Sequence, residues 1–199
     1  MRLGIVGPAS GNVDAFREAA EFLLGDAACD QLVYLGVDDV VDRIAQAWLS
    51  ELGGGAGKSF EDRAVELALG GSPAAIEGLL EADVQVARLE RIRKIPKPPA
   101  RAVELLDDRI VVLVHDKAVL DEEDIANSHL LVYGQSKEML LRKFGPRAFF
   151  SPGPLESGRV GVVEIEDEGR VTVSVFDLEG TPILRETLGQ RSAKLTVAS

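Results

Sequence analysis

The fold is decided by the stretch from Arg109 to Lys137. It contains Arg109-Ile-Val-Val-Leu-Val-His115-Asp-Lys117 and, after a charged connector, His129-Leu-Leu-Val-Tyr-Gly-Gln-Ser-Lys137. Each of these two parts is a short run rich in Val, Ile and Leu that ends abruptly in polar residues, and such runs predict buried strands. Because ligands of α/β sheets usually bind at the rim where the carboxyl ends of strands meet, we expect a site there.

The composition indicates one compact domain. The chain has 199 residues, 46% of them hydrophobic, which is enough to bury a real core. With 33 acidic and 22 basic residues the net charge is −11, and such a field repels nucleic acid and anionic membranes. No apolar run is long enough to span a membrane or to act as a signal peptide. The single cysteine, Cys29, is expected to be buried. It cannot form an internal disulfide, which fits a reducing compartment, so we predict a cytoplasmic protein.

The first half of the chain begins with alternating strands and helices. Residues 3–6 and 31–35 predict short buried strands, and Asn12 predicts the N-cap of a helix over residues 13–24. The pattern is then helical from Val40 to Lys94, with a flexible joint at residues 53–57. The expected helices cover residues 40–52, 60–69 and the segment from Pro73 onward.

The helix that begins at Pro73 carries an apolar stripe. The stripe consists of Ile76, Leu80, Val84 and Ala87, and Leu79 and Val86 broaden it. A stripe of this width predicts that the helix packs against the sheet. Beyond the helix, prolines at positions 96, 98 and 99 end helical structure.

The second half of the chain is mostly β-structure. Residues 102–106 and 110–114 predict a hairpin, and a short helix near residues 121–126 leads to a strand over residues 130–133. Further strands are expected at residues 139–142, 148–151, 160–165, 171–176 and 181–188. We therefore expect a single domain over residues 1–199, in which residues 190–199 form a loose tail.

Several strand ends carry fragments of a known set of motifs. Gly11-Asn12 follows the first expected strand, Leu35-Gly36 ends the second, and Ser151-Pro152-Gly153 precedes the closing hairpin. In this order and spacing they resemble the calcineurin-like metallophosphoesterases, in the small bacterial phosphodiesterase branch. The resemblance implies an α/β fold in which two mixed β-sheets pack face to face with helices on the outside, a four-layer α/β/β/α sandwich.

Most of the metal ligands that this resemblance implies are replaced. The family places Asp-x-His, Gly-Asp, Gly-Asn-His, a single His and Gly-His-x-His after successive strands. Gly70-Gly71-Ser72 is the nearest counterpart of the Asn-His element, and only His115 survives as a ligand. The other ligand positions are occupied by Pro8, Ser10, Val37, Gln135 and Lys137.

The loss of the bridging carboxylate at Val37 decides our expectation for metals. Two divalent cations about 3.7 Å apart repel by roughly 18 kcal/mol at an effective dielectric of about 20, so a bridging anion is close to obligatory. We expect no cofactor; the alternative is one weakly bound divalent metal at Asp38, His115 and Gln135. Lys137 argues against that metal because its ammonium supplies a fixed positive charge. The strand ends also offer a possible anion pocket formed by Ser10, Asn12, Asp38, His115, Gln135 and Lys137.

Two other segments bear on function. Residues 54–59, Gly-Gly-Ala-Gly-Lys-Ser, partly match a nucleotide-binding P-loop, but Leu52 stands where its first glycine belongs, so a joint between helices is the better interpretation. A basic run is either the C-terminal end of a helix or a docking patch for an acidic partner or phosphate. Its members are Arg88, Arg91, Arg93, Lys94, Lys97 and Arg101. The run lacks interleaved aromatic residues, so it does not predict nucleic-acid binding.

Together these observations favour a catalytically inactive metallophosphoesterase-like protein that acts as a protein-interaction scaffold or regulator. The small retromer subunit, which resembles these enzymes and acts as an interaction scaffold, provides an analogy. We expect a protein partner, no nucleic acid and no membrane. One alternative is a divergent metal-dependent phosphoesterase that uses one ion and His115. Another is a phosphate or nucleotide sensor without hydrolysis, which would depend on Lys137.

Overall fold

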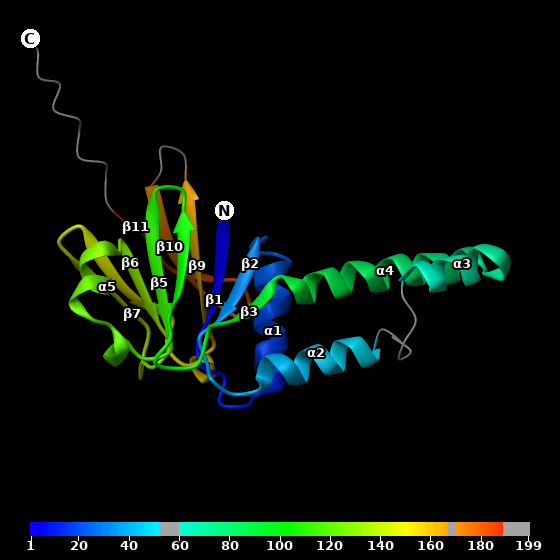
Figure 1. Cartoon of the computed structure of the whole chain (residues 1–199), viewed down its shortest axis with the longest axis horizontal. Helices are drawn as coiled ribbons and strands as arrows, with labels where there is room; N and C mark the ends of the chain where they lie inside the picture. The colour runs from blue at the N-terminus through cyan, green and yellow to red at the C-terminus, as the bar shows by residue number, and fades with distance from the viewer. Residues whose placement is uncertain (52–59, 167–169, 189–199) are drawn as a thin grey trace, which may run out of the picture.

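Two mixed β-sheets stack face to face in the structure, a computed structural model that describes residues 1–51, 60–166 and 170–188 (Figure 1). The first sheet consists of β1 (Arg2–Val6), β2 (Gln31–Tyr34), β3 (Ile92–Lys94), β9 (Arg159–Glu166), β10 (Arg170–Asp177) and β11 (Pro182–Leu188). Its order is β11-β10-β9-β1-β2-β3, in which β1, β2 and β3 are parallel and β9 runs antiparallel to β1.

The second sheet has the order β4-β5-β6-β8-β7. Its strands are β4 (Ala102–Leu106), β5 (Arg109–Val114), β6 (Leu130–Tyr133), β7 (Leu140–Phe144) and β8 (Arg147–Ser151). The three central strands β5, β6 and β8 are parallel, and the edge strands β4 and β7 pair antiparallel to their neighbours. The expected hairpin at the β4–β5 turn and most expected strands are therefore confirmed.

The helices lie outside the two sheets, and some of them cover the outer faces. They are α1 (Val13–Leu24), α2 (Val40–Glu51), α3 (Phe60–Gly70), α4 (Pro73–Glu90) and α5 (Glu122–Asn127), with short 3-10 helices η1 (Lys117–Val119) and η2 (Leu155–Ser157). Residues of α1 and α2 pack on the outer face of β1 and β2, whereas η1 and α5 pack on the outer face of β5 and β6. The core between the sheets joins β1 and β2 to β5, β6 and β8. The predicted four-layer sandwich is confirmed.

Apolar periodicity placed most of these elements correctly, and Cys29 is fully buried as predicted. Burial raises the pKa of the Cys29 thiol to about 11, so the thiolate is scarcely populated at neutral pH.

Within the described residues no helix has the length and apolarity to cross a bilayer. The expected joint at residues 53–57, the P-loop-like residues 54–59 and the tail at residues 190–199 lie outside the described residues.

Two expectations for the helical region are wrong. The last helix does not reach Lys94: it ends at Glu90, and the following basic residues form β3, which pairs parallel with β2. The apolar stripe of α4 also does not pack against the sheet, because Ile76, Leu80 and Val84 are 41%, 54% and 59% exposed. In Figure 1, α4 instead extends away from both sheets, with α3 alongside its outer part.

Candidate functional site at the strand ends

The ends of β2, β5 and β6 converge on one backbone carbonyl. The Nδ1 atom of His115, the residue after β5, lies 2.8 Å from the carbonyl oxygen of Leu35, the residue after β2. The residue after β6, Gly134, approaches the same carbonyl so closely that an added Cβ would lie 2.6 Å from its oxygen. The two sheets therefore share a rim at these ends, as the two apolar runs predicted.

A buried phenol holds the end of β2 to the loop after β1. Tyr34 is 0% exposed, and its hydroxyl accepts a hydrogen bond from the Ala9 amide at 2.9 Å. The same hydroxyl donates to Asp38 Oδ1 at 2.8 Å. Burial raises the pKa of Tyr34, and the hydrogen bond to Asp38 raises it further, so the phenol stays protonated. The ring also requires a glycine two residues later, because a Cβ at Gly36 would lie 2.1 Å from the Tyr34 oxygen.

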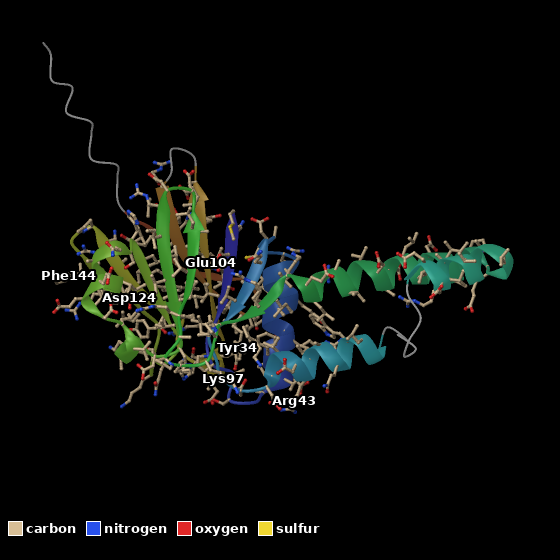
Figure 2. The ribbon with its side chains drawn as sticks, in the orientation of Figure 1. Tyr34, Arg43, Lys97, Glu104, Asp124 and Phe144 are labelled. Carbon is tan, nitrogen blue, oxygen red and sulfur yellow. The ribbon has the colours of Figure 1, made fainter. Side chains whose placement is uncertain are left out.

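The Asp38 carboxylate is a structural centre of this region. Besides the Tyr34 hydroxyl, Oδ1 accepts from the Val40 amide at 3.2 Å, which turns the chain into the first turn of α2. Its other oxygen, Oδ2, accepts from the Gly11 amide at 3.0 Å. Arg43 of α2 donates to the Gly11 carbonyl at 3.1 Å, so both the amide and the carbonyl of Gly11 are bound by side chains that follow β2. Figure 2 shows Tyr34 and Arg43 close to each other in the lower middle of the view.

Two of the predicted pocket residues belong to the loop that Asp38 holds. Ser10 is exposed and has a φ of 51°, a left-handed conformation that a non-glycine residue adopts only when its surroundings impose it. Asn12 is exposed, and its side chain accepts a hydrogen bond from the Ala15 amide at 3.1 Å as the N-cap of α1. The predicted cap is confirmed, and the side-chain oxygen Oδ1 of Asn12 is used for this hydrogen bond within the fold.

The other predicted pocket residues lie after β5 and β6. The Gln135 amide donates to the His115 carbonyl at 2.6 Å, so these two residues lie together. The side chains of Gln135 and Lys137 are exposed, and His115 is half-buried. Because a carbonyl can only accept, Nδ1 of His115 is the donor in this bond, and Nε2 is the other ring nitrogen. In the described part of the chain we find no hydrogen bond to that Nε2 atom.

The side chains at this rim do not fit the two-metal centre that the resemblance implies. Pro8 and Val37 have no ligand atoms in their side chains, and Val37 is 45% exposed at the place of the bridging carboxylate. The neighbouring carboxylate of Asp38 is already held by three hydrogen-bond donors. Over residues 1–51, 60–166 and 170–188, no group of three or more His, Cys, Asp or Glu side chains is arranged to hold a metal.

The predicted basic docking patch is spread over several elements and is largely engaged within the molecule. Arg91 donates to the backbone carbonyls of Cys29 and Asp30. Lys97 is exposed, as Figure 2 shows, and the patch as a docking surface stays a prediction. Arg88 is half-buried in the last turn of α4. Ion pairs of three further members join Arg93 to Glu104, Lys94 to Asp42, and Arg101 to Asp121 and Asp124.

The Arg101 ion pairs lie at the edge of a cavity of about 350 Å³ between β4, β5 and the start of α5. This cavity has a mixed lining, with Val103 and Ile110 on the strands and Glu123 among the carboxylates on the helix side. His115, Gln135 and Lys137 are not among its lining residues. The predicted anion pocket therefore does not coincide with this hollow.

Sequence reasoning missed Tyr34 altogether. The residue lies inside an apolar run that predicts a strand, and a tyrosine in a strand is ordinarily explained by packing. The available signal was the spacing from Tyr34 to Asp38, which places a carboxylate just beyond the strand end on the loop to the next helix. That spacing does not reveal the third partner, the Ala9 amide, which comes from a distant segment.

Comparison with solved structures identifies the fold. YfcE, a phosphoesterase from E. coli, matches with a TM-score of 0.54 and 19% identity, covering 95% of this chain and 100% of that chain. A predicted phosphoesterase from Streptococcus pneumoniae matches with a TM-score of 0.53 and 13% identity, covering 96% and 99%. Vacuolar protein sorting 29 from Cryptosporidium parvum matches with a TM-score of 0.52 and 13% identity, covering 95% and 98%.

The chain therefore has the calcineurin-like metallophosphoesterase fold, as the strand-end motifs predicted. Comparison of the sequence with protein-family models gives no match, and comparison with curated protein sequences gives none either. At these identities the likeness concerns the fold, so function has to be argued from the side chains at the strand ends.

Proposed function

We propose that this protein is a non-catalytic protein on a phosphoesterase fold, which acts as an interaction scaffold or regulator for a protein partner. The observation that carries the proposal is the engagement of Asp38 by Tyr34, Gly11 and Val40. An ionised carboxylate offers about four lone-pair positions, and three of them are used here. A metal at Asp38 would have to displace donors that hold the loop after β1 against the end of β2.

The residue substitutions support the same proposal. The fold hosts a two-metal centre only where anions lie between the cations, and Val37 offers a hydrocarbon side chain in that place. Among the solved proteins with a similar fold, one is a phosphoesterase, and another carries the name vacuolar protein sorting 29. The fold therefore does not by itself require hydrolysis, and the rim of this chain favours a structural role.

The test is hydrolysis of bis(4-nitrophenyl) phosphate by the purified full chain with excess Mn²⁺. We expect the wild type and His115→Ala to give the same rate as buffer with Mn²⁺ alone. His129→Ala is the matched control, because His129 is the only other histidine and lies at the beginning of β6, away from the rim. Turnover that His115→Ala abolishes and His129→Ala retains would overturn the proposal.

The second candidate function is a divergent phosphoesterase with a single metal ion. One specific observation favours it: the bond from His115 to Leu35 fixes the tautomer that leaves Nε2 available as a ligand. This candidate predicts that His115→Ala removes both Mn²⁺ binding and turnover. The hydrolysis assay above distinguishes it from the non-catalytic proposal directly.

A further inference from the structure

The helices α3 and α4 form an arm, residues 60–90, that extends from the two-sheet body (Figure 1). The α4 helix has 18 residues, which at about 1.5 Å per residue gives a length of about 27 Å. α3 packs against α4, and α2 packs against part of α4. Only the base of the arm joins the body, where Leu89 packs into the core beneath α1 and α2.

α4 has two apolar faces, and only one of them is covered. The covered face includes Leu79 and Ala82, each 8% exposed. The second face carries Ile76, Leu80 and Val84, which are 41%, 54% and 59% exposed. With about 100° of turn per residue, this stripe lies roughly a third of a turn away from the covered face.

The neighbouring helix α3 adds further apolar surface to the arm. Its residues Val65 and Leu69 are 58% and 84% exposed. Single exposed apolar side chains are normal, but the arm exposes five of them on two packed helices, and three of these form the stripe on α4. Helical periodicity predicts that the stripe on α4 will be buried, and nothing in the described part of the chain buries it.

Acidic residues border the stripe on both sides. On a helical wheel, Glu77 and Glu81 follow Val84 on one side, and Asp83 precedes Ile76 on the other. Arg88 shares the first border but lies in the last turn of α4, at the base of the arm. All three carboxylates are exposed. A surface with an apolar centre and a negative rim is complementary to an amphipathic helix whose own apolar stripe is bordered by cations.

The same charges argue against a second copy of this chain. In an antiparallel pair of α4 helices centred on Leu80, each border of the stripe would lie next to the same border of the other copy, so Glu77 would approach Glu81 and Asp83 would approach Asp83. In a parallel pair, the border with Glu77 and Glu81 would lie next to the border with Asp83. Both arrangements place like charges next to each other along the seam, which disfavours association.

We infer that the arm binds an α-helix of a partner protein that carries an apolar stripe bordered by Lys or Arg on both sides. This inference rests on the proposed scaffold function, for which it names the surface and the chemistry of the partner. The apolar stripe supplies the binding energy, and the carboxylates select the charge of the partner.

The test uses two fluorescein-labelled helical peptides of about 18 residues with identical leucine stripes. One peptide has Lys on both borders of the stripe, and the other has Glu. Fluorescence anisotropy with the full chain should give at least about tenfold tighter binding of the Lys peptide. Equal affinity for the two peptides would overturn the inference.

Variants of the arm locate the binding surface. Leu80→Glu should weaken binding of the Lys peptide by at least about tenfold, although it makes the protein more acidic and would strengthen a purely electrostatic attraction. The matched control is Leu105→Glu on β4, because Leu105 is also an exposed leucine, at 66% against 54% for Leu80, and lies outside the arm. Circular dichroism and the melting temperature should match the wild type for both variants.

Charge reversal tests the selectivity. The triple variant Glu77→Lys, Glu81→Lys, Asp83→Lys should prefer the Glu peptide. An unchanged preference for the Lys peptide in this variant, or wild-type affinity in Leu80→Glu, would overturn the inference. Self-association in sedimentation equilibrium that Leu80→Glu abolishes would overturn it in favour of a second copy. Leu80-dependent binding to phosphatidylcholine vesicles would overturn it in favour of a membrane.

The two proposals fail separately. If neither peptide depends on Leu80 while Mn²⁺-dependent hydrolysis stays at background, the arm assignment falls and the non-catalytic role stands. If His115-dependent turnover is found, the non-catalytic role falls, whatever the peptides do. The hydrolysis assay reports on the strand ends and the anisotropy assay on the arm, so one result does not determine the other.

Discussion

The hydroxyl of Tyr34 donates a hydrogen bond to Asp38, with 2.8 Å between the phenol oxygen and Oδ1. The phenol lies at 0% exposure, and it also receives the Ala9 amide. The segment at the end of β2 is thus joined to the loop after β1 through one buried side chain and one carboxylate. This arrangement uses the rim of a phosphoesterase fold for structural support.

Removing the Tyr34 hydroxyl should destabilise the protein. In Tyr34→Phe the buried Ala9 amide loses its acceptor and Asp38 loses a donor, so we expect the free energy of unfolding to fall by about 1–3 kcal/mol. Urea denaturation followed by circular dichroism measures the change. Tyr133→Phe is the matched control, because Tyr133 is the only other tyrosine and is 3% exposed. An equal loss in both variants would contradict the role given to the Tyr34 hydroxyl.

Two glycine substitutions should act in opposite directions. Gly36→Ala would place a Cβ 2.1 Å from the Tyr34 oxygen, which is fixed by burial, so we expect a loss of about 2 kcal/mol or more. Gly78→Ala meets no atom within 4 Å on α4, and the better helix propensity of alanine should add about 0.5–1 kcal/mol. Melting temperatures of the two variants provide the measurement. A neutral Gly36→Ala would show that Tyr34 is not held as described.

The hydrogen bond that His129 accepts should make the stability of the protein depend on pH. The Nδ1 atom of His129 accepts the Ile110 amide at 3.1 Å, so it must be unprotonated to keep that bond. Burial lowers the pKa of His129 below its ordinary 6.5, and the nearby charge of Arg109 lowers it further. The unfolded chain therefore binds the proton more readily, and stability should fall as the pH drops below about 6.5.

Urea unfolding at pH 5.5 and at pH 7.5 tests this pH dependence of the free energy of unfolding. His129→Asn keeps an acceptor near the Ile110 amide but cannot titrate, so its loss of stability between these pH values should be smaller than that of the wild type. Parallel pH profiles for the wild type and His129→Asn would contradict the prediction.

The sequence predicts the strands well because buried parallel strands appear as continuous apolar runs, as in the segments that became β5 and β6. It does not predict β3, since Ile92–Lys94 is short and basic and its pairing with β2 is a non-local contact. The stripe at Leu80 shows a different limit. Periodicity reveals that a helix face is apolar but does not reveal which partner covers it.

The strand-end site is predictable in part for the same reason. The absence of a carboxylate at Val37 is visible in the sequence, and so is the survival of His115. The use of Asp38 is visible only in its spacing from Tyr34, because its other partner Gly11 comes from a distant segment that the tertiary fold brings to it. A sequence pattern shows which polar side chains are present at the strand ends. The tertiary fold determines which of them form hydrogen bonds within the protein.

The measurement that tests the central claim most directly is calorimetric titration of the full chain with Mn²⁺, compared with His115→Ala. The account predicts that the wild type binds fewer than two ions per chain, because Val37 supplies no bridging ligand and Asp38 holds Tyr34. Two ions bound per chain, with binding lost in His115→Ala while the melting temperature stays unchanged, would contradict it.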